Sequence, residues 1–143
     1  MNLGYKYRFI KNSGKAIQCF GEALEVYRHI HDAPNLSIAQ ALNYLGATYR
    51  EAGDPAQSID YCQQALEMKI ALYGDVPHEE IAFTLGSLGR GYKLLGDRES
   101  ALQSHRKVYE IYKQLKGEEH ADTKEALDFL QAELERAAQE TSH

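Results

Sequence analysis

The stretch ALNYLGATYR, residues 41–50, decides the fold because its pattern recurs along the chain. Forty-three residues later it returns as TLGSLGRGYK, residues 84–93, with leucine, leucine, glycine and tyrosine in the same places. A shift of 42 residues in the other direction places Leu3, Gly4 and Tyr7 on the same motif. Repetition at a fixed period predicts an array of similar structural units.

Each unit also has a second segment with a pattern of its own. Cys62 in the second unit corresponds to Phe20 in the first and to His105 in the third. In both kinds of segment the apolar residues are three and four positions apart, which is helical periodicity, and no segment alternates for long enough to form a strand. The predicted helices span residues 2–11, 14–30, 36–52, 55–72, 77–95, 98–116 and 120–137.

The residues between these segments are typical of helix ends. Asp54 and Asp97 are expected to cap the helices that follow them, with Pro55 in the first helical position. Pro77 is expected to open another helix. The negative charge of Glu79 should stabilise that helix by interacting with the positive end of its dipole. The sharp turns are expected at Gly53, Gly96 and Gly117.

Gly46 and Gly89 occupy equivalent positions inside the first helix of their units. A residue without a side chain lets two helix backbones approach closely, and small residues such as Ser58 and Ala101 do the same from the second helix. The sequence therefore predicts that the two helices of each pair cross at these glycines.

The motif Leu45-Gly46-x-x-Tyr49, with Gly53-Asp54 and Ala65-Leu66 after it, resembles a tetratricopeptide repeat. The period of 42 to 43 residues and the connector at residues 72–78 are similar to the kinesin light chain class of that family. The resemblance implies an all-α fold, a right-handed α-solenoid of antiparallel helix pairs with about 3 to 3.5 repeats. It also implies that a peptide segment of another protein binds in the concave groove.

The repeat pattern predicts one domain over residues 1–136, followed by a frayed tail over 137–143. Because the first copy of the motif begins at Leu3, the chain is expected to be a piece of a longer array. An incomplete first repeat could also promote association between copies of the chain. The expected divisions are a partial repeat at 2–35, repeats at 36–76 and 77–118, and a partial repeat or capping helix at 119–136.

Composition narrows the classes of function. The formal net charge of −5 argues against nucleic acid as a partner, and the absence of a long apolar run argues against a membrane segment, so a cytoplasmic protein is expected. Cys19 and Cys62 are too few for a disulfide framework or a zinc site. With no catalytic constellation in view, we expect neither an enzyme nor a bound cofactor or metal.

In the family that the chain resembles, the first helix of each pair lines the inner surface. Arg8, Arg50 and Lys93 each follow the repeat tyrosine directly, and Arg90 lies one turn before Lys93. These bases and the neighbouring aromatic residues suit an acidic peptide with an apolar anchor. The expected peptide-binding residues are Tyr5, Arg8, Asn43, Tyr44, Arg50, Phe83, Arg90 and Lys93.

Two other interpretations stay open. The bases could simply be solvated on a helix face or pair with nearby acids, and the chain could be a structural segment that stacks or self-associates within a scaffold. The fourth copy breaks the basic pattern with Glu125, Asp128 and Glu135. These acids either end the groove or orient a ligand by repulsion.

Overall fold

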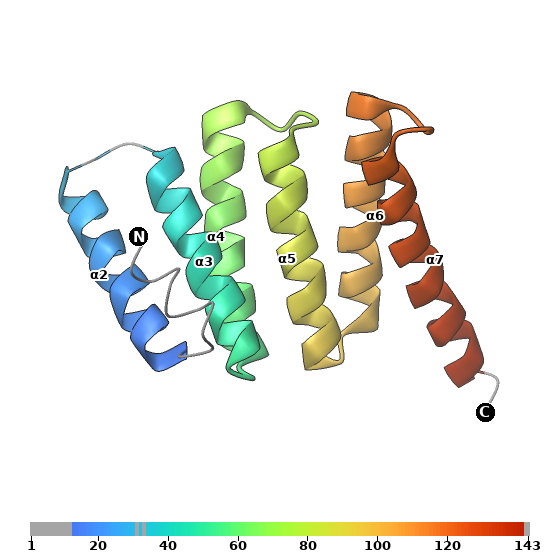
Figure 1. Ribbon diagram of the computed structural model, residues 1–143, viewed down its shortest axis with the longest axis horizontal. Helices are drawn as coiled ribbons and strands as arrows, with labels where there is room; N and C mark the ends of the chain where they lie inside the picture. The colour runs from blue at the N-terminus through green and yellow to red at the C-terminus, as the bar shows by residue number, and fades with distance from the viewer. Residues whose placement is uncertain (1–12, 31, 33, 142–143) are drawn as a thin grey trace. The chain divides into compact units, whose positions relative to one another are not determined.

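The computed structural model describes residues 13–30, 32 and 34–141, and every regular element among them is an α-helix (Figure 1). This confirms the predicted all-α fold. The helix expected at residues 2–11 lies outside the described residues. The helices are α2 (Ser13–Ile30), α3 (Leu36–Glu51), α4 (Pro55–Tyr73), α5 (Glu79–Leu95), α6 (Arg98–Lys116) and α7 (Ala121–Thr141).

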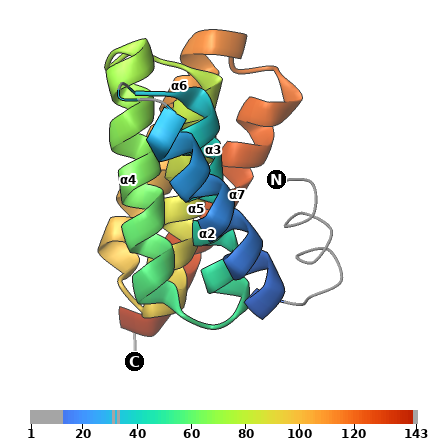
Figure 2. The same cartoon turned by 90° about the vertical axis from the view of Figure 1, so that its left-hand side faces the viewer.

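The chain divides into two compact units, which we call the N-terminal unit (residues 1–76) and the C-terminal unit (residues 77–143). In the N-terminal unit α3 packs against both α2 and α4, as the view in Figure 2 shows from the side of α2. In the C-terminal unit α6 packs against both α5 and α7. The division lies between residues 76 and 77, and the expected single domain and its repeat bounds stay predictions.

The aspartate caps form as predicted. The Asp54 carboxylate accepts a hydrogen bond from the backbone N–H of Gln57 at 3.2 Å, and Pro55 is the first residue of α4. Asp97 accepts from the backbone N–H of Ser100, also at 3.2 Å. Each cap satisfies one of the N–H groups that a helix start leaves without an intrahelical partner.

Helix α5 begins two residues later than the sequence suggests. His78 has an extended backbone and is the N-cap, and its Nδ1 accepts a hydrogen bond from the backbone N–H of Glu80 at 3.0 Å. Glu79 is therefore the first helical residue, the place that was expected for Pro77, and the His78 imidazole caps the helix before it. The cap requires Nδ1 to be unprotonated, which places the ring proton on Nε2.

The predicted helix crossings are present in both units. A Cβ added to Gly46 would overlap the Cys62 sulfur of α4 and lie 3.1 Å from the Ser58 carbonyl oxygen. A Cβ added to Gly89 would lie 2.5 Å from the His105 ring of α6. Real Cβ atoms essentially never come as close to another atom as these two would to the Cys62 sulfur and the His105 ring, so both helix pairs depend on glycine at the crossing.

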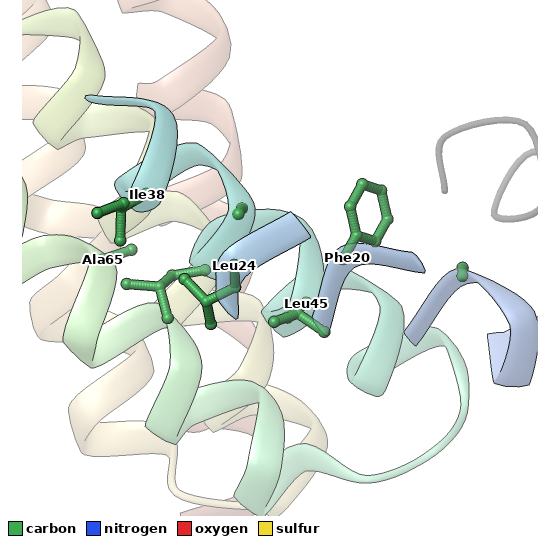
Figure 3. Close-up of a cluster of buried hydrophobic side chains, with 8 residues drawn as sticks. Phe20, Leu24, Ile38, Leu45 and Ala65 are labelled. Carbon is green, nitrogen blue, oxygen red and sulfur yellow. The ribbon is translucent and has the colours of Figure 1, made fainter. Parts of the chain in front are cut away.

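The core of the N-terminal unit joins its three helices. Phe20 and Leu24 of α2 pack with Ile38 and Leu45 of α3, and Ala65 contributes from α4 (Figure 3). All five are at most 5% exposed. Burying a side chain of the size of leucine or phenylalanine contributes about 1.5–3 kcal/mol, so this cluster holds α2 onto the α3–α4 pair.

The tail that was expected to fray over residues 137–143 is helical as far as the structure describes it, because α7 continues to Thr141. The carboxylate of Glu140 forms an ion pair with Arg98 at the start of α6, and the Thr141 hydroxyl donates to the Ala138 carbonyl oxygen at 3.0 Å. A side-chain partner on α6 therefore reaches the last turn of α7, which apolar periodicity alone did not reveal.

Candidate functional site

One face of α5 combines an exposed aromatic ring, an open glycine and an exposed base. Phe83 is 55% exposed, and Arg90 is exposed seven residues later, which is two helical turns along the same face. Gly86 lies between them, and a Cβ added there would meet nothing within 4 Å. We call Phe83, Gly86 and Arg90 the α5 face.

The charge at Arg90 is available for a ligand. Among the residues that the structure describes, no carboxylate forms an ion pair with it. The glycine one turn away leaves the helix backbone accessible, so an extended chain could approach α5 closely at this point. The arrangement offers one positive charge, an apolar ring and an accessible stretch of helix backbone between them.

Lys93, which was expected beside Arg90, is already engaged. Its Nζ lies 2.6 Å from the Glu133 carboxylate of α7 and 5.5 Å from the centroid of the Phe129 ring. Glu133 also lies 3.5 Å from an Arg136 nitrogen. The basic position next to the α5 face is therefore largely neutralised within the C-terminal unit.

The expected site residues of α3 are less open than those of α5. Tyr44 is half-buried and stacks on Phe20 with ring centroids 5.2 Å apart, so it packs on the core of the N-terminal unit. Asn43 is only 2% exposed and does not offer its amide to a ligand. Arg50 is half-buried. Tyr5 and Arg8 lie outside the described residues.

The two residues opposite the crossing glycines are buried and differ in chemistry. Burial raises the pKa of the Cys62 thiol to about 11, and the positive charge of Arg50 opposes that rise only in part. Burial lowers the pKa of His105, as do the charges of Arg90 and Lys93, while Glu133 acts in the opposite direction. Cys62 is therefore a protonated, weakly reactive thiol at neutral pH, and His105 favours the uncharged state.

His105 packs tightly between two helices. Its ring lies under Gly89 of α5, and its centroid is 4.4 Å from that of Phe129 in α7. Its Nε2 is buried and has no hydrogen-bond partner among the described residues. The residue is only 5% exposed and belongs to the core, as do Phe20 and Cys62 at the equivalent positions of the other repeat units.

Other kinds of site find no support in the described part of the chain. No group of three or more His, Cys, Asp or Glu residues there is placed to hold a metal ion. Nor does any helix of that part have the length and apolar character to span a bilayer. A shallow groove in the N-terminal unit, lined by Ile38, Met68 and Arg28 among others, is bridged by a hydrogen bond of 3.4 Å from Arg28 to Gln64.

Sequence reasoning missed Glu133, the acid that meets Lys93. Alignment with the earlier repeats pointed to Glu125, Asp128 and Glu135, because these residues match the groove positions of the repeat. Glu133 aligns instead with Gly91, a buried position of α5. The signal that could have identified it is the spacing of Phe129 and Glu133, four residues apart on one face of α7 and therefore able to contact one cation together.

Comparison with known proteins agrees with the repeat pattern. A model of the tetratricopeptide repeat family matches residues 1–71 and 37–114. The chain is 24% identical over 119 residues, 83% of its length, to protein KINESIN LIGHT CHAIN-RELATED 2 of Arabidopsis thaliana. It is 32% identical over 78 residues, 54% of its length, to the clustered mitochondria protein homologs of Culex quinquefasciatus and Aedes aegypti. It covers only 18%, 6% and 5% of these three proteins, respectively.

Proposed function

The chain belongs to the tetratricopeptide repeat family, whose repeats generally mediate protein–protein interactions, and on that premise we propose that it binds a peptide segment of another protein at the α5 face. The observation that carries the proposal is the pairing of an exposed ring at Phe83 with an exposed charge at Arg90 across the open Gly86. The ligand we propose has an acidic residue near an aromatic or aliphatic side chain.

Charge and apolar area would play different parts in this complex. A carboxylate of the ligand accepts charge-assisted hydrogen bonds from the Arg90 guanidinium, which bind more strongly than bonds between neutral groups. An apolar side chain of the ligand covers Phe83 and removes its ring from water, which contributes affinity without depending on salt. Gly86 lets the ligand backbone approach the helix between the two contacts.

Selection of peptides on the full chain tests the proposal. A random 12-residue library displayed on phage is enriched on the immobilised protein, and the affinities of selected peptides are measured by fluorescence anisotropy. We expect selected peptides to carry an acidic residue close to an apolar one. Arg90→Glu should weaken their binding by about 2 kcal/mol, the scale of one charge-assisted contact, and should flatten the dependence on salt.

Matched variants separate the α5 face from general surface effects. Arg106→Glu reverses an exposed charge on α6, and Leu115→Ala shortens an apolar residue that is 44% exposed on α6, so neither should alter binding. Phe83→Ala should reduce affinity and leave the salt dependence unchanged. Arg50 is a poor probe because it is half-buried and its charge acts on Cys62. Full-strength binding by Arg90→Glu would refute the proposed site.

A further inference from the structure

The contact between Lys93 and Glu133 changes which ligands the neighbouring α5 face can accept. The Lys93 side chain is 39% exposed, whereas that of Glu133 is only 10% exposed. The carboxylate is therefore the anchored member of the pair, and the lysine is the member that solvent and a ligand can reach. A ligand that approaches Lys93 meets a positive charge that already has a negative partner.

The packing of α7 fixes Glu133 in this position. Phe129 precedes it by one helical turn and packs its ring against that of the buried His105. The same Phe129 ring lies 5.5 Å from the Lys93 ammonium group. Because this aromatic contact anchors α7 on α6, the backbone of α7 keeps the Glu133 carboxylate within reach of Lys93.

We infer that Glu133 determines the charge specificity of the α5 face, by neutralising Lys93 so that the face selects peptides with one carboxylate beside the apolar anchor. This inference rests on the proposed function. A second carboxylate placed toward Lys93 gains little, because it must compete with Glu133 for the same ammonium group and is repelled by that acid. Glu133 is thus a specificity residue that acts through Lys93.

Pairs of peptides that differ in one acid test this role. The probes are a selected single-acid peptide and derivatives with one glutamate added one, two or three positions away, toward Lys93. Arg90 and Lys93 are one helical turn apart, and two residues of an extended peptide span roughly 7 Å, so this series covers the needed distances. In the wild-type chain we expect the added acid to improve affinity less than twofold.

Removing the Glu133 charge should create the missing preference. In Glu133→Gln we expect at least one of the two-acid derivatives to bind about fivefold more tightly than in wild type, while the single-acid parent changes less than twofold. Glu135→Gln, an exposed acid on the same helix, is the control and should change neither value. Adding Lys93→Gln to Glu133→Gln should abolish the gain; a gain that survives would act through Arg136 and would overturn the role of Lys93.

A measurement without a ligand tests the same contact. Acetylation of Lys93 by a water-soluble succinimidyl ester, followed by mass spectrometry, should be faster in Glu133→Gln than in wild type, relative to the exposed Lys107. Equal rates would overturn the inference because Glu133 would not shield Lys93. If peptides bind through Arg90 but Glu133→Gln changes no preference, only the inference fails. If no peptide binds any variant, both the inference and the proposed function fail.

Discussion

The two helix crossings share a glycine but differ in the residue that faces it. In the N-terminal unit Gly46 faces the Cys62 thiol, and in the C-terminal unit Gly89 faces the ring of His105. Both partners are buried, at 0% and 5% exposure. The backbone approach is therefore set by the glycine, and the second helix can supply either a small apolar group or a flat polar ring.

The difference in partner gives the two units different chemistry. Cys62 is uncharged at all ordinary pH values, because burial raises its pKa to about 11. His105 also connects to a third helix, since its ring contacts Phe129 of α7. Protonation of His105 would place a charge inside the C-terminal unit, whereas nothing at the equivalent position of the N-terminal unit titrates between pH 5 and 8.

The largest expected effect follows from filling either crossing. Gly46→Leu and Gly89→Leu should each destabilise the chain by about 3 kcal/mol or more, since even a methyl group has no room at either position. Urea unfolding followed by circular dichroism measures the loss. Gly86→Leu is the matched control in α5, because its Cβ would meet open space, and it should be neutral or slightly stabilising. Equal losses at Gly86 and Gly89 would contradict the crossing geometry.

A smaller effect distinguishes the two partners. Gly46→Ala and Gly89→Ala should each cost about 1–3 kcal/mol from overpacking, reduced by up to about 1 kcal/mol because alanine favours a helix. All the close neighbours of a Cβ at position 89 belong to the His105 ring, whereas at position 46 the Ser58 carbonyl oxygen is close as well.

Double variants in urea measure that difference. When His105 is already alanine, adding Gly89→Ala should lower the free energy of unfolding by much less than it does in the wild-type chain. When Cys62 is already alanine, adding Gly46→Ala should keep more of its cost, because the Ser58 carbonyl oxygen is part of the backbone and stays in place. Equal reductions of the cost at the two crossings would show that the backbone at Ser58 yields easily.

The smallest effect is a dependence on pH in the C-terminal unit. The pKa of His105 is lower in the folded state than its ordinary value of 6.5, so the unfolded chain binds the proton first as pH falls. The stability that the uncharged His105 gives to the folded state is fully present above pH 6.5. It is lost as pH falls toward the folded pKa, and the free energy of unfolding then changes by at most ~1.4 kcal/mol per pH unit. Urea unfolding at several pH values from 7.5 to 5 measures it.

Exchange of the crossing partner isolates this effect. His105→Cys copies the N-terminal crossing and should remove the slope, although it should also lower stability at pH 7.5 because it leaves a cavity. His78 and His120 accept backbone hydrogen bonds through Nδ1. To separate their effects from that of His105, both are replaced in the parent chain by asparagine, which accepts such bonds at a helix start as Asn35 does at α3. A slope that persists in His105→Cys would assign the acid sensitivity to other groups.

The repeat pattern was sufficient to predict the helix order and both crossings. Glycine at a crossing leaves a clear trace, because it is costly inside a helix and its recurrence needs a physical reason. The start of α5 at Glu79 instead of Pro77 and the last turn of α7 were not predicted, because each depends on one side-chain contact. Such contacts leave no periodic signal in the sequence.

The candidate site was predictable only where a helix face stays open. Phe83 and Arg90 were identified by repeat register, and both are exposed. Register could not show that Lys93 has a partner on α7, because that contact joins segments 40 residues apart in a copy that departs from the pattern. It also could not show that Asn43 is buried, because register assigned this residue to the groove-lining face of its helix.

Helix α7 also matters for how the molecule behaves in a concentrated solution. It contains six acidic and two basic residues, so it carries four of the five net negative charges of the chain. Three of its acids, Asp122, Glu133 and Glu140, neutralise lysine or arginine side chains of α5 and α6. Proteins near zero net charge precipitate readily, so α7 acts as the colloidal stabiliser of this chain, and a deletion of α7 would leave an almost neutral protein with newly uncovered cations.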